Sequence, residues 1–243
     1  MTAKYDRSIK MFDEAYAPET LDRIVSSKKI NSGKFLTQAH AGSYMLQMQT
    51  IHRIPDVRSV FELGPGEHFC ANNMRNIGYD YTTFDFEKTH NPTIVGDWNT
   101  FDVKRHPRKY DICCAFQVLE HFSWSSFKLN LMKLSLLSKK YIFISLPYSC
   151  YGSRVHVVSQ KRQNVLKESV HEDFYPTNLP QRKYRKEYIE EFPWAVHYWE
   201  IGREGISLDT VFNVCTQCSF DILSAFHSPN PYHYFILMQI RGV

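Results

Sequence analysis

The chain has 243 residues, 43% of them hydrophobic, which suits one well-buried α/β domain with a small lid and excludes two full domains. The formal net charge of +4 is mild, so it neither requires nor excludes a nucleic-acid partner. Residues 1–24 lack the apolar core of a signal peptide, and no segment has the length of a membrane span. These features predict a cytoplasmic protein without a membrane partner.

The first predicted unit is a helical cap over residues 1–57. Breaks at Pro18, Gly33 and Pro55 divide it, and residues 35–51 are its strongest helix candidate. The second predicted unit covers residues 58–243 and carries the chemistry.

A tight glycine turn follows the first predicted strand. The sequence Glu62-Leu-Gly64-Pro65-Gly66 ends an apolar run, and a second strand ends on Asp85. Glycine lets the backbone turn sharply and approach a ligand at the mouth of a sheet. Asp85 follows Gly64 by about twenty residues, where an acid accepts hydrogen bonds from both ribose hydroxyls. The spacing therefore predicts a nucleoside pocket.

The third glycine of a dinucleotide-binding turn is missing. Counted from Gly64, its place is held by Phe69, and Glu67 and His68 precede it. A carboxylate on Glu67 at a helix start would repel the phosphates that a helix N-terminus attracts, and Glu62 adds a second negative charge. S-adenosylmethionine, which has no phosphate and carries an ammonium and a sulfonium, suits this turn better than NAD does.

Short apolar runs alternate with helical patterns after the turn. The sequence predicts helices over 67–77 and 123–137 and strands over 93–95, 111–115 and 141–145. Such alternation indicates a parallel sheet covered on both faces, with ligands beyond the carboxyl ends of the strands.

The C-terminal pattern is different. Two β-rich runs, 220–227 and 232–240, flank the sequence Ser228-Pro-Asn-Pro231. A parallel crossover needs a dozen or more residues, so this short connection predicts an antiparallel hairpin.

With these motifs the chain resembles the class I S-adenosylmethionine-dependent methyltransferases, in the small-molecule branch that carries Leu-Glu-His. The first motif is the acid at Glu62 with the Gly-x-Gly turn. Gly96-Asp97-Trp98 is similar to the end of the family's third strand, and residues 110–121 are similar to the fourth strand and its exit. The resemblance implies an α/β, Rossmann-like class I methyltransferase fold, with a mostly parallel seven-stranded sheet and an antiparallel C-terminal strand.

The resemblance also implies S-adenosylmethionine as the cofactor. Asp97 is expected to receive the adenine amino group, and Trp98 to cover the ring. The residues expected to hold the cofactor are Glu62, Gly64, Pro65, Gly66, Asp85, Phe86, Asp97, Trp98 and Gln117. One departure from the family is His68, where many members have a third small residue.

An insert over residues 148–205 is rich in Tyr, His, Lys and Arg. Such a mixture stacks on bases and holds phosphates, or it forms a lid with buried aromatics and solvent-facing charges. Acids interrupt the basic residues, which favours the lid. We expect it to form the acceptor pocket, with Tyr148, Tyr151, His156, His171 and Trp199 as candidate substrate-binding residues.

The candidate catalytic residues are His121, His197 and Glu200. Methyl transfer depends mainly on alignment of the two reactants, and a general base matters most for a hydroxyl acceptor. His121 leaves the fourth strand at the rim where the methyl group lies, as a base or as a pocket-lining residue. His197 and Glu200 are three positions apart, so on a helix they share a face and orient each other; surface or lid packing is the alternative.

The sequence thus predicts an S-adenosylmethionine-dependent methyltransferase acting on an O or N nucleophile of a small or medium-sized molecule. The alternatives are a non-catalytic scaffold subunit, or an RNA or protein methyltransferase that uses the insert. Residues 117–121 lack the Pro-Pro-aromatic sequence of base-flipping enzymes, which argues against a nucleic-acid base as acceptor.

No metal site is expected from the sequence. The pair Cys215 and Cys218 lacks a second pair of ligands, and no cluster of oxygen ligands follows the fourth strand. Two of the six cysteines are adjacent in a predicted buried strand, which favours reduced thiols over disulfides. The sequence is compatible with an oligomer and does not require one.

Overall fold

The computed structural model describes residues 37–106, 109–160, 166–191 and 195–242. The chain divides into two units, Met1–Ala41 and Gly42–Val243, and the following description concerns the second. The helix predicted over 35–51 is found as α3 (Gln38–Arg53). The rest of the predicted N-terminal cap before residue 37 lies outside the described residues.

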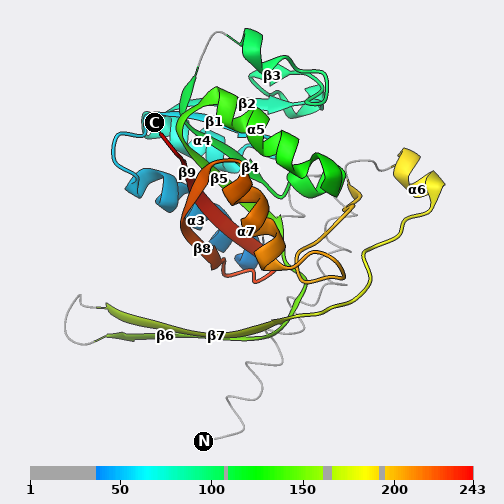
Figure 1. Ribbon diagram of the computed structural model, residues 1–243. Helices are drawn as coiled ribbons and strands as arrows, with labels where there is room; N and C mark the ends of the chain where they lie inside the picture. The colour runs from blue at the N-terminus through cyan, green and yellow to red at the C-terminus, as the bar shows by residue number, and fades with distance from the viewer. Residues whose placement is uncertain (1–36, 107–108, 161–165, 192–194, 243) are drawn as a thin grey trace, which may run out of the picture. The chain divides into compact units, whose positions relative to one another are not determined.

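A seven-stranded sheet organises this unit, in the order β3-β2-β1-β4-β5-β9-β8 (Figure 1). The pairs among β1 to β5 are parallel, and β9 is antiparallel to both β5 and β8. The strands are β1 (Ser59–Leu63), β2 (Asp80–Asp85), β3 (Ile94–Val95), β4 (Tyr110–Phe116), β5 (Ser138–Pro147), β8 (Phe220–His227) and β9 (His233–Ile240). The predicted sheet, including its antiparallel C-terminal hairpin, is confirmed.

Helices cover both faces of the sheet, which is why all residues of β1 are buried. One apolar cluster includes Leu134 of α5 (Phe127–Leu137) and Val211 of α7 (Leu208–Gln217). The cluster on the other face includes Ile51 of α3 and Met74 of α4 (Phe69–Asn76). Both clusters take alternate residues of the same strands, so the sheet is the shared centre of the core.

The helix boundaries differ from the predicted ones for local reasons. Helix α4 begins at Phe69 and not at Glu67, because His68 adopts a left-handed φ of 60° that an α-helix cannot contain. A 3₁₀ turn, Trp124–Ser126, precedes α5, so the helix predicted from residue 123 is divided in two. Among the described residues, no helix is both long enough and apolar enough to cross a membrane.

The predicted lid contains a long β-hairpin that the sequence did not indicate. Strands β6 (Cys150–Gln160) and β7 (Leu166–Pro176) pair antiparallel as a separate two-stranded sheet. The prediction that the aromatics of the insert are buried holds for Tyr148 and Trp199 but is wrong for Tyr151 and Tyr175, which are 57% and 59% exposed. A two-stranded sheet on its own offers no second layer to cover them.

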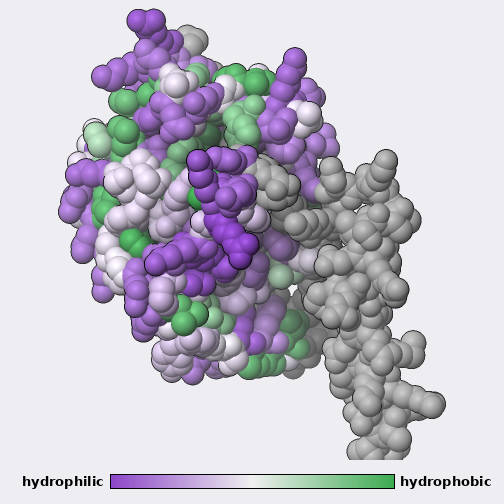
Figure 2. All heavy atoms as spheres, turned by 90° about the vertical axis from the view of Figure 1, so that its right-hand side faces the viewer, coloured by the Kyte–Doolittle hydropathy of each residue, from purple (hydrophilic) through white to green (hydrophobic). Residues whose placement is uncertain are grey.

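Many charged residues of the insert face solvent, as predicted, but the prediction is wrong for Glu200, which is fully buried, and for Arg203, which is largely buried beside it. Helix α6 (Lys186–Glu191) carries an exposed ion pair between Lys186 and Glu190, with 3.6 Å between Nζ and Oε1. The face of the molecule on the side of α6 is mainly hydrophilic (Figure 2).

Candidate active site

The glycine turn stands at the carboxyl end of β1. Gly64 and Gly66 have positive φ angles of 67° and 54°, which glycine adopts without strain. The Gly64 amide donates to the Phe84 carbonyl at 2.8 Å, which holds the turn against the end of β2. A Cβ on Gly64 would lie 2.5 Å from a methyl group of Val118, whereas one on Gly66 would meet open space. The turn therefore lies against the exit of β4 on one side and is open on the other.

Glu62 is a buried acid directly before this turn. It is 4% exposed, and its Oε2 has no hydrogen-bond partner among the described residues. Burial raises the pKa of Glu62 to about 7; the Tyr81 hydroxyl and the charge of Arg75 oppose this rise, and the charge of Asp85 adds to it. A cationic ligand at the turn would satisfy this carboxylate.

Asp85 ends β2 beside the turn. It is 7% exposed, and its carboxylate accepts a hydrogen bond from the Glu87 amide at 2.9 Å. The imidazole Nδ1 of His90 lies 3.4 Å from the other carboxylate oxygen. Phe86, the next residue, is exposed. The predicted ribose acid and its neighbour thus lie at the mouth of the sheet.

An open cleft of about 390 Å³ adjoins the turn. Its lining residues are Gly66, Glu67, His68, Asn72, Arg75, Thr89, His90 and Asn91. A second hollow, of about 440 Å³, lies at the start of α7, where Tyr148 forms part of its wall.

Of the two residues predicted to hold adenine, Asp97 is exposed and Trp98 is buried. Asp97 is exposed, and its Oδ1 accepts from the Asn99 amide at 2.9 Å. Trp98 is 3% exposed, and its ring centroid lies 5.6 Å from that of Phe84. Its indole nitrogen donates to Asn130 Oδ1 at 3.1 Å. This placement gives the Trp98 side chain a packing role in the core and leaves Asp97 at the rim.

Gln117 marks the exit of β4 with a positive φ of 55°. Its amide donates to the Ser145 carbonyl at 3.0 Å, and its side-chain Nε2 donates to the Ser145 hydroxyl at 3.2 Å. These bonds fix the turn that leads into Leu119–His121, a 3₁₀ element labelled η4.

A cluster of two histidines and one glutamate forms at this exit. Glu120 and His121 belong to η4, and His197 comes from the insert. One potential ligand atom from each of the three side chains lies within 4.8 Å of the others. The two imidazole centroids are 5.0 Å apart. The insert is fastened here by the Tyr198 amide, which donates to the Glu120 carbonyl at 2.9 Å.

The protonation states in this cluster follow from burial. Burial lowers the pKa of His121 to about 4, so the ring is neutral at physiological pH. Its Nδ1 lies 2.8 Å from the Val196 carbonyl, which only accepts, so the proton is on Nδ1 and Nε2 keeps its lone pair. Glu120 is fully buried, and burial raises its pKa to about 8.

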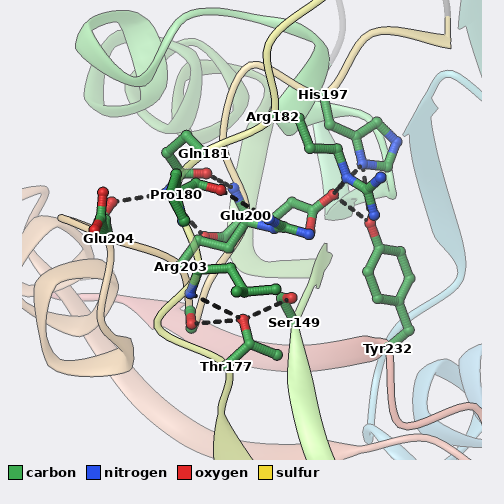
Figure 3. A network of polar contacts seen from close by, with 12 residues as sticks. Ser149, Thr177, Pro180, Gln181, Arg182, His197, Glu200, Arg203, Glu204 and Tyr232 are labelled. Atoms are coloured by element: carbon green, nitrogen blue, oxygen red, sulfur yellow. Dashed lines mark hydrogen bonds and ion pairs between the residues drawn. The ribbon is translucent and has the colours of Figure 1, made fainter.

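Glu200 orients His197 from the other side. Its fully buried carboxylate accepts from Arg203 and from the Tyr232 hydroxyl, each at 2.7 Å, and from Arg182 (Figure 3). The Nδ1 of His197 lies 3.3 Å from the same carboxylate. Burial alone would raise the pKa of Glu200, but the hydrogen bonds from His197, Arg203, Tyr232 and Arg182 together hold it well below the usual range.

The predicted contact between His197 and Glu200 is present, although the reason given for it was wrong. Residues 197–200 are not helical. The two side chains meet because the arginines and Tyr232 fix the carboxylate beside the ring.

The candidate acceptor residues are dispersed. Tyr151 and His156 lie on β6 and His171 lies on β7, all of them exposed on the separate hairpin. Tyr148 is 9% exposed and stacks on His227, with 5.0 Å between ring centroids. Trp199 is 1% exposed and packs in the core. The structure therefore brings together His121, His197 and Glu200, and separates them from the residues on the hairpin.

Sequence reasoning passed over several residues of this centre. Glu120 was not named as a candidate site residue, and neither were Arg182, Arg203 and Tyr232. Glu120 carried no local signal, because it stands between Leu119 and His121 and a glutamate is rarely fully buried. The partners of Glu200 depend on the path of the insert and carried no local signal.

Comparison with known proteins establishes the fold. No protein-family model and no curated protein matches the sequence. The glycopeptide N-methyltransferase MtfA complexed with S-adenosylmethionine matches with a TM-score of 0.52 and 9% identity, over 82% of this chain and 94% of that chain. Magnesium protoporphyrin IX methyltransferase from Synechocystis PCC 6803 matches with a TM-score of 0.52 and 10% identity, over 95% of this chain and 99% of that chain.

The small RNA methyltransferase HEN1 also matches, with a TM-score of 0.50 and 10% identity, over 83% of this chain and 25% of that chain. The strand order, the glycine turn after β1 and the antiparallel β9 agree with these similarities. The chain therefore has the Rossmann-like fold of the class I S-adenosylmethionine-dependent methyltransferases.

Proposed function

We propose that this protein is an S-adenosylmethionine-dependent methyltransferase acting on an O or N nucleophile of a small or medium-sized molecule. The observation that carries the proposal is the adjacency of two sites. The open glycine turn beside Glu62 and Asp85 lies against Val118, and the cluster of His121 and Glu120 follows directly after Val118. A cofactor pocket and a group of titratable side chains thus share one edge of the sheet.

The residues at the turn fit S-adenosylmethionine. The cofactor carries positive charge on its ammonium and sulfonium, and the buried Oε2 of Glu62 has no hydrogen-bond partner among the described residues. Asp85 is assigned to the ribose hydroxyls, Phe86 and Asp97 to the adenine end, and Gln117 to the methionine end. When bound, the cofactor supplies the methyl group from its sulfonium centre.

The acceptor is assigned to the side of the cluster. His121, with an unprotonated Nε2, is the residue proposed to act on the acceptor, and Glu200 orients His197 next to it. Alignment of the two reactants supplies most of the acceleration, and removal of the acceptor's proton adds to it. Among the candidate acceptor residues, Tyr148 lines the hollow at the start of α7.

A small or medium-sized acceptor fits the insert better than RNA does. MtfA and the porphyrin methyltransferase are named for such acceptors, whereas HEN1 is named for small RNA. Nucleic-acid surfaces need uncompensated positive charge. In the described part of the insert, Arg154 pairs with Glu172 and Lys186 pairs with Glu190.

Replacement of Asp85 tests the cofactor assignment. Asp85→Ala is expected to weaken S-adenosylmethionine binding by at least about tenfold in calorimetry, because two charge-assisted hydrogen bonds to the ribose are lost. Asp80→Ala is the matched control, since Asp80 is an exposed aspartate at the other end of β2. Equal affinities for the two variants and the wild type would remove Asp85 from the site.

The pH dependence of binding tests Glu62. Because burial raises the pKa of Glu62 to about 7, much of the free protein is protonated there at pH 6 and little at pH 8. A cation binds the ionised form, so affinity is expected to rise about tenfold from pH 6 to pH 8 and then level off. Calorimetry at several pH values on the wild type and Glu62→Gln measures this, and the rise should vanish in the variant. A wild-type affinity that is constant over this range would contradict the role.

A further inference from the structure

Glu120 is a buried acid whose carboxylate has no hydrogen-bond partner among the described side chains. It is 0% exposed, and neither carboxylate oxygen hydrogen-bonds to another described residue. An unsatisfied buried polar group costs about 1–3 kcal/mol, and more when it is charged. A side chain in this position is stabilised if a cation binds beside it.

The two histidines next to Glu120 are oriented as metal ligands are. In metal sites a ligating imidazole usually donates its other N–H to a carbonyl or a carboxylate. His121 donates Nδ1–H to the Val196 carbonyl at 2.8 Å. His197 directs Nδ1 to the Tyr232 hydroxyl at 3.0 Å and to Glu200 at 3.3 Å, and its other ring nitrogen lies on the opposite side of the ring from Glu200 (Figure 3). With Nδ1 engaged in this way, each ring has its Nε2 left as the possible ligand atom.

The support of His197 is itself rigid. Glu200 is fixed by Arg203 and by the Tyr232 hydroxyl, each at 2.7 Å. A carboxylate that holds a histidine in one tautomer raises the basicity of its free nitrogen and fixes the direction of the ring.

We propose that Glu120, His121 and His197 bind one divalent transition-metal ion at the exit of β4. One ligand atom from each lies within 4.8 Å of the others. Zinc ligands lie about 2 Å from the ion, so any two are at most about 4 Å apart, and the group has to contract by roughly 1 Å to close on it. No metal site was expected from the sequence, because His197 joins the other two only through the fold of the insert.

The ligand set selects the kind of ion. Two imidazole nitrogens and one carboxylate oxygen suit Zn²⁺ and its transition-metal neighbours, whereas Mg²⁺ and Ca²⁺ prefer oxygen ligands. Three protein ligands leave at least one coordination position for water or for an acceptor, as in catalytic zinc sites.

The position of the ion gives it a role, which rests on the proposed function. The cluster follows Val118, which lies against the glycine turn, so an acceptor held by the ion would lie at the same edge of the sheet as the cofactor turn. A bound divalent ion lowers the pKa of a hydroxyl, and its proton leaves to solvent. The oxygen lone pair then forms the bond to the methyl carbon, and the carbon–sulfur electron pair stays on sulfur, which loses its positive charge. His121 acts as a ligand in this step and not as the base.

Zinc titration of the full-length protein tests the site without cofactor or acceptor. Protein freed of metal by a chelator is titrated with ZnCl₂ in a calorimeter, and one Zn²⁺ is expected to bind per chain and to raise the melting temperature. Glu120→Gln keeps the shape of the side chain and removes the anionic ligand, and His197→Asn removes a ligand that is only part-buried. Each variant is expected to bind Zn²⁺ at least about a hundredfold more weakly, and Glu200→Gln about 10–100-fold more weakly, as for an indirect partner.

The matched control is His52→Ala, an exposed histidine on α3 that hydrogen-bonds to Tyr79 and is expected to leave zinc affinity unchanged. Circular dichroism verifies that each variant is folded. Absence of zinc binding by the wild type, or equal binding by the wild type and the folded variant His197→Asn, would overturn the proposal. S-adenosylmethionine is titrated separately into the same proteins, so loss of the metal site is distinguished from failure of the cofactor assignment.

Discussion

Replacing His121 by alanine is expected to lower the rate of methyl transfer by roughly 10²–10⁴-fold. The ring stands at the exit of β4, and its Nδ1–H bond to Val196 leaves Nε2 unprotonated. Whether Nε2 takes the proton of the acceptor or holds an ion that acidifies it, alanine removes the function. Transfer of labelled methyl groups from S-adenosylmethionine into small molecules of a cell extract measures the effect, and it also identifies the acceptor.

The affinity for S-adenosylmethionine separates this role from a structural one. His121→Ala should change that affinity by less than about threefold, since a group that acts in the transition state leaves ground-state binding largely unaltered. His52→Ala is the control for the loss of an imidazole elsewhere. Normal methyl transfer by His121→Ala would remove this residue from the reaction.

Replacing Trp199 by alanine is expected to lower the free energy of unfolding by about 3–5 kcal/mol. The indole is 1% exposed, and its ring centroid lies 4.9 Å from that of Trp124 and 5.0 Å from that of Phe127. Its nitrogen also donates to the Phe122 carbonyl at 3.1 Å. Alanine leaves a cavity and an unpaired carbonyl together, and urea denaturation followed by circular dichroism measures the loss.

Two further variants sharpen this test. Trp199→Phe keeps most of the buried ring and should lose less than the alanine variant does. Tyr198→Ala, next in sequence and 46% exposed, should change the free energy of unfolding by less than about 1 kcal/mol. A small loss for Trp199→Ala would contradict the packing role and restore Trp199 as a candidate for acceptor contact.

The sheet was predictable because its signals are local. Strands β4 and β5 contain short runs of apolar residues, and the short Ser228-Pro-Asn-Pro231 connection forces the hairpin of β8 and β9. The glycine turn was identifiable for the same reason, since positive φ angles at Gly64 and Gly66 require that residue type. No comparable sequence signal marked the left-handed backbone conformation of His68, which makes α4 begin at Phe69.

The features of the fold and site that sequence did not predict depend on contacts between residues far apart in the chain. Strands β6 and β7 pair with each other. Neither has the regular alternation of apolar and polar residues that predicts a strand from sequence. Trp98 was assigned to the cofactor by resemblance, yet the side chain fills the core against Phe84 and hydrogen-bonds to Asn130. His197 reaches His121 only because the insert returns to η4 through the hydrogen bond from Tyr198 to Glu120.

Native mass spectrometry of the purified full-length chain tests the central claim most directly. The account predicts a species heavier than the bare chain by one S-adenosylmethionine or its demethylated product, either as purified or after addition of the cofactor. The same species should be strongly reduced for Asp85→Ala and retained for Asp80→Ala. A wild-type chain that remains bare when S-adenosylmethionine is added in excess would contradict the account and favour a scaffold that has kept only the fold.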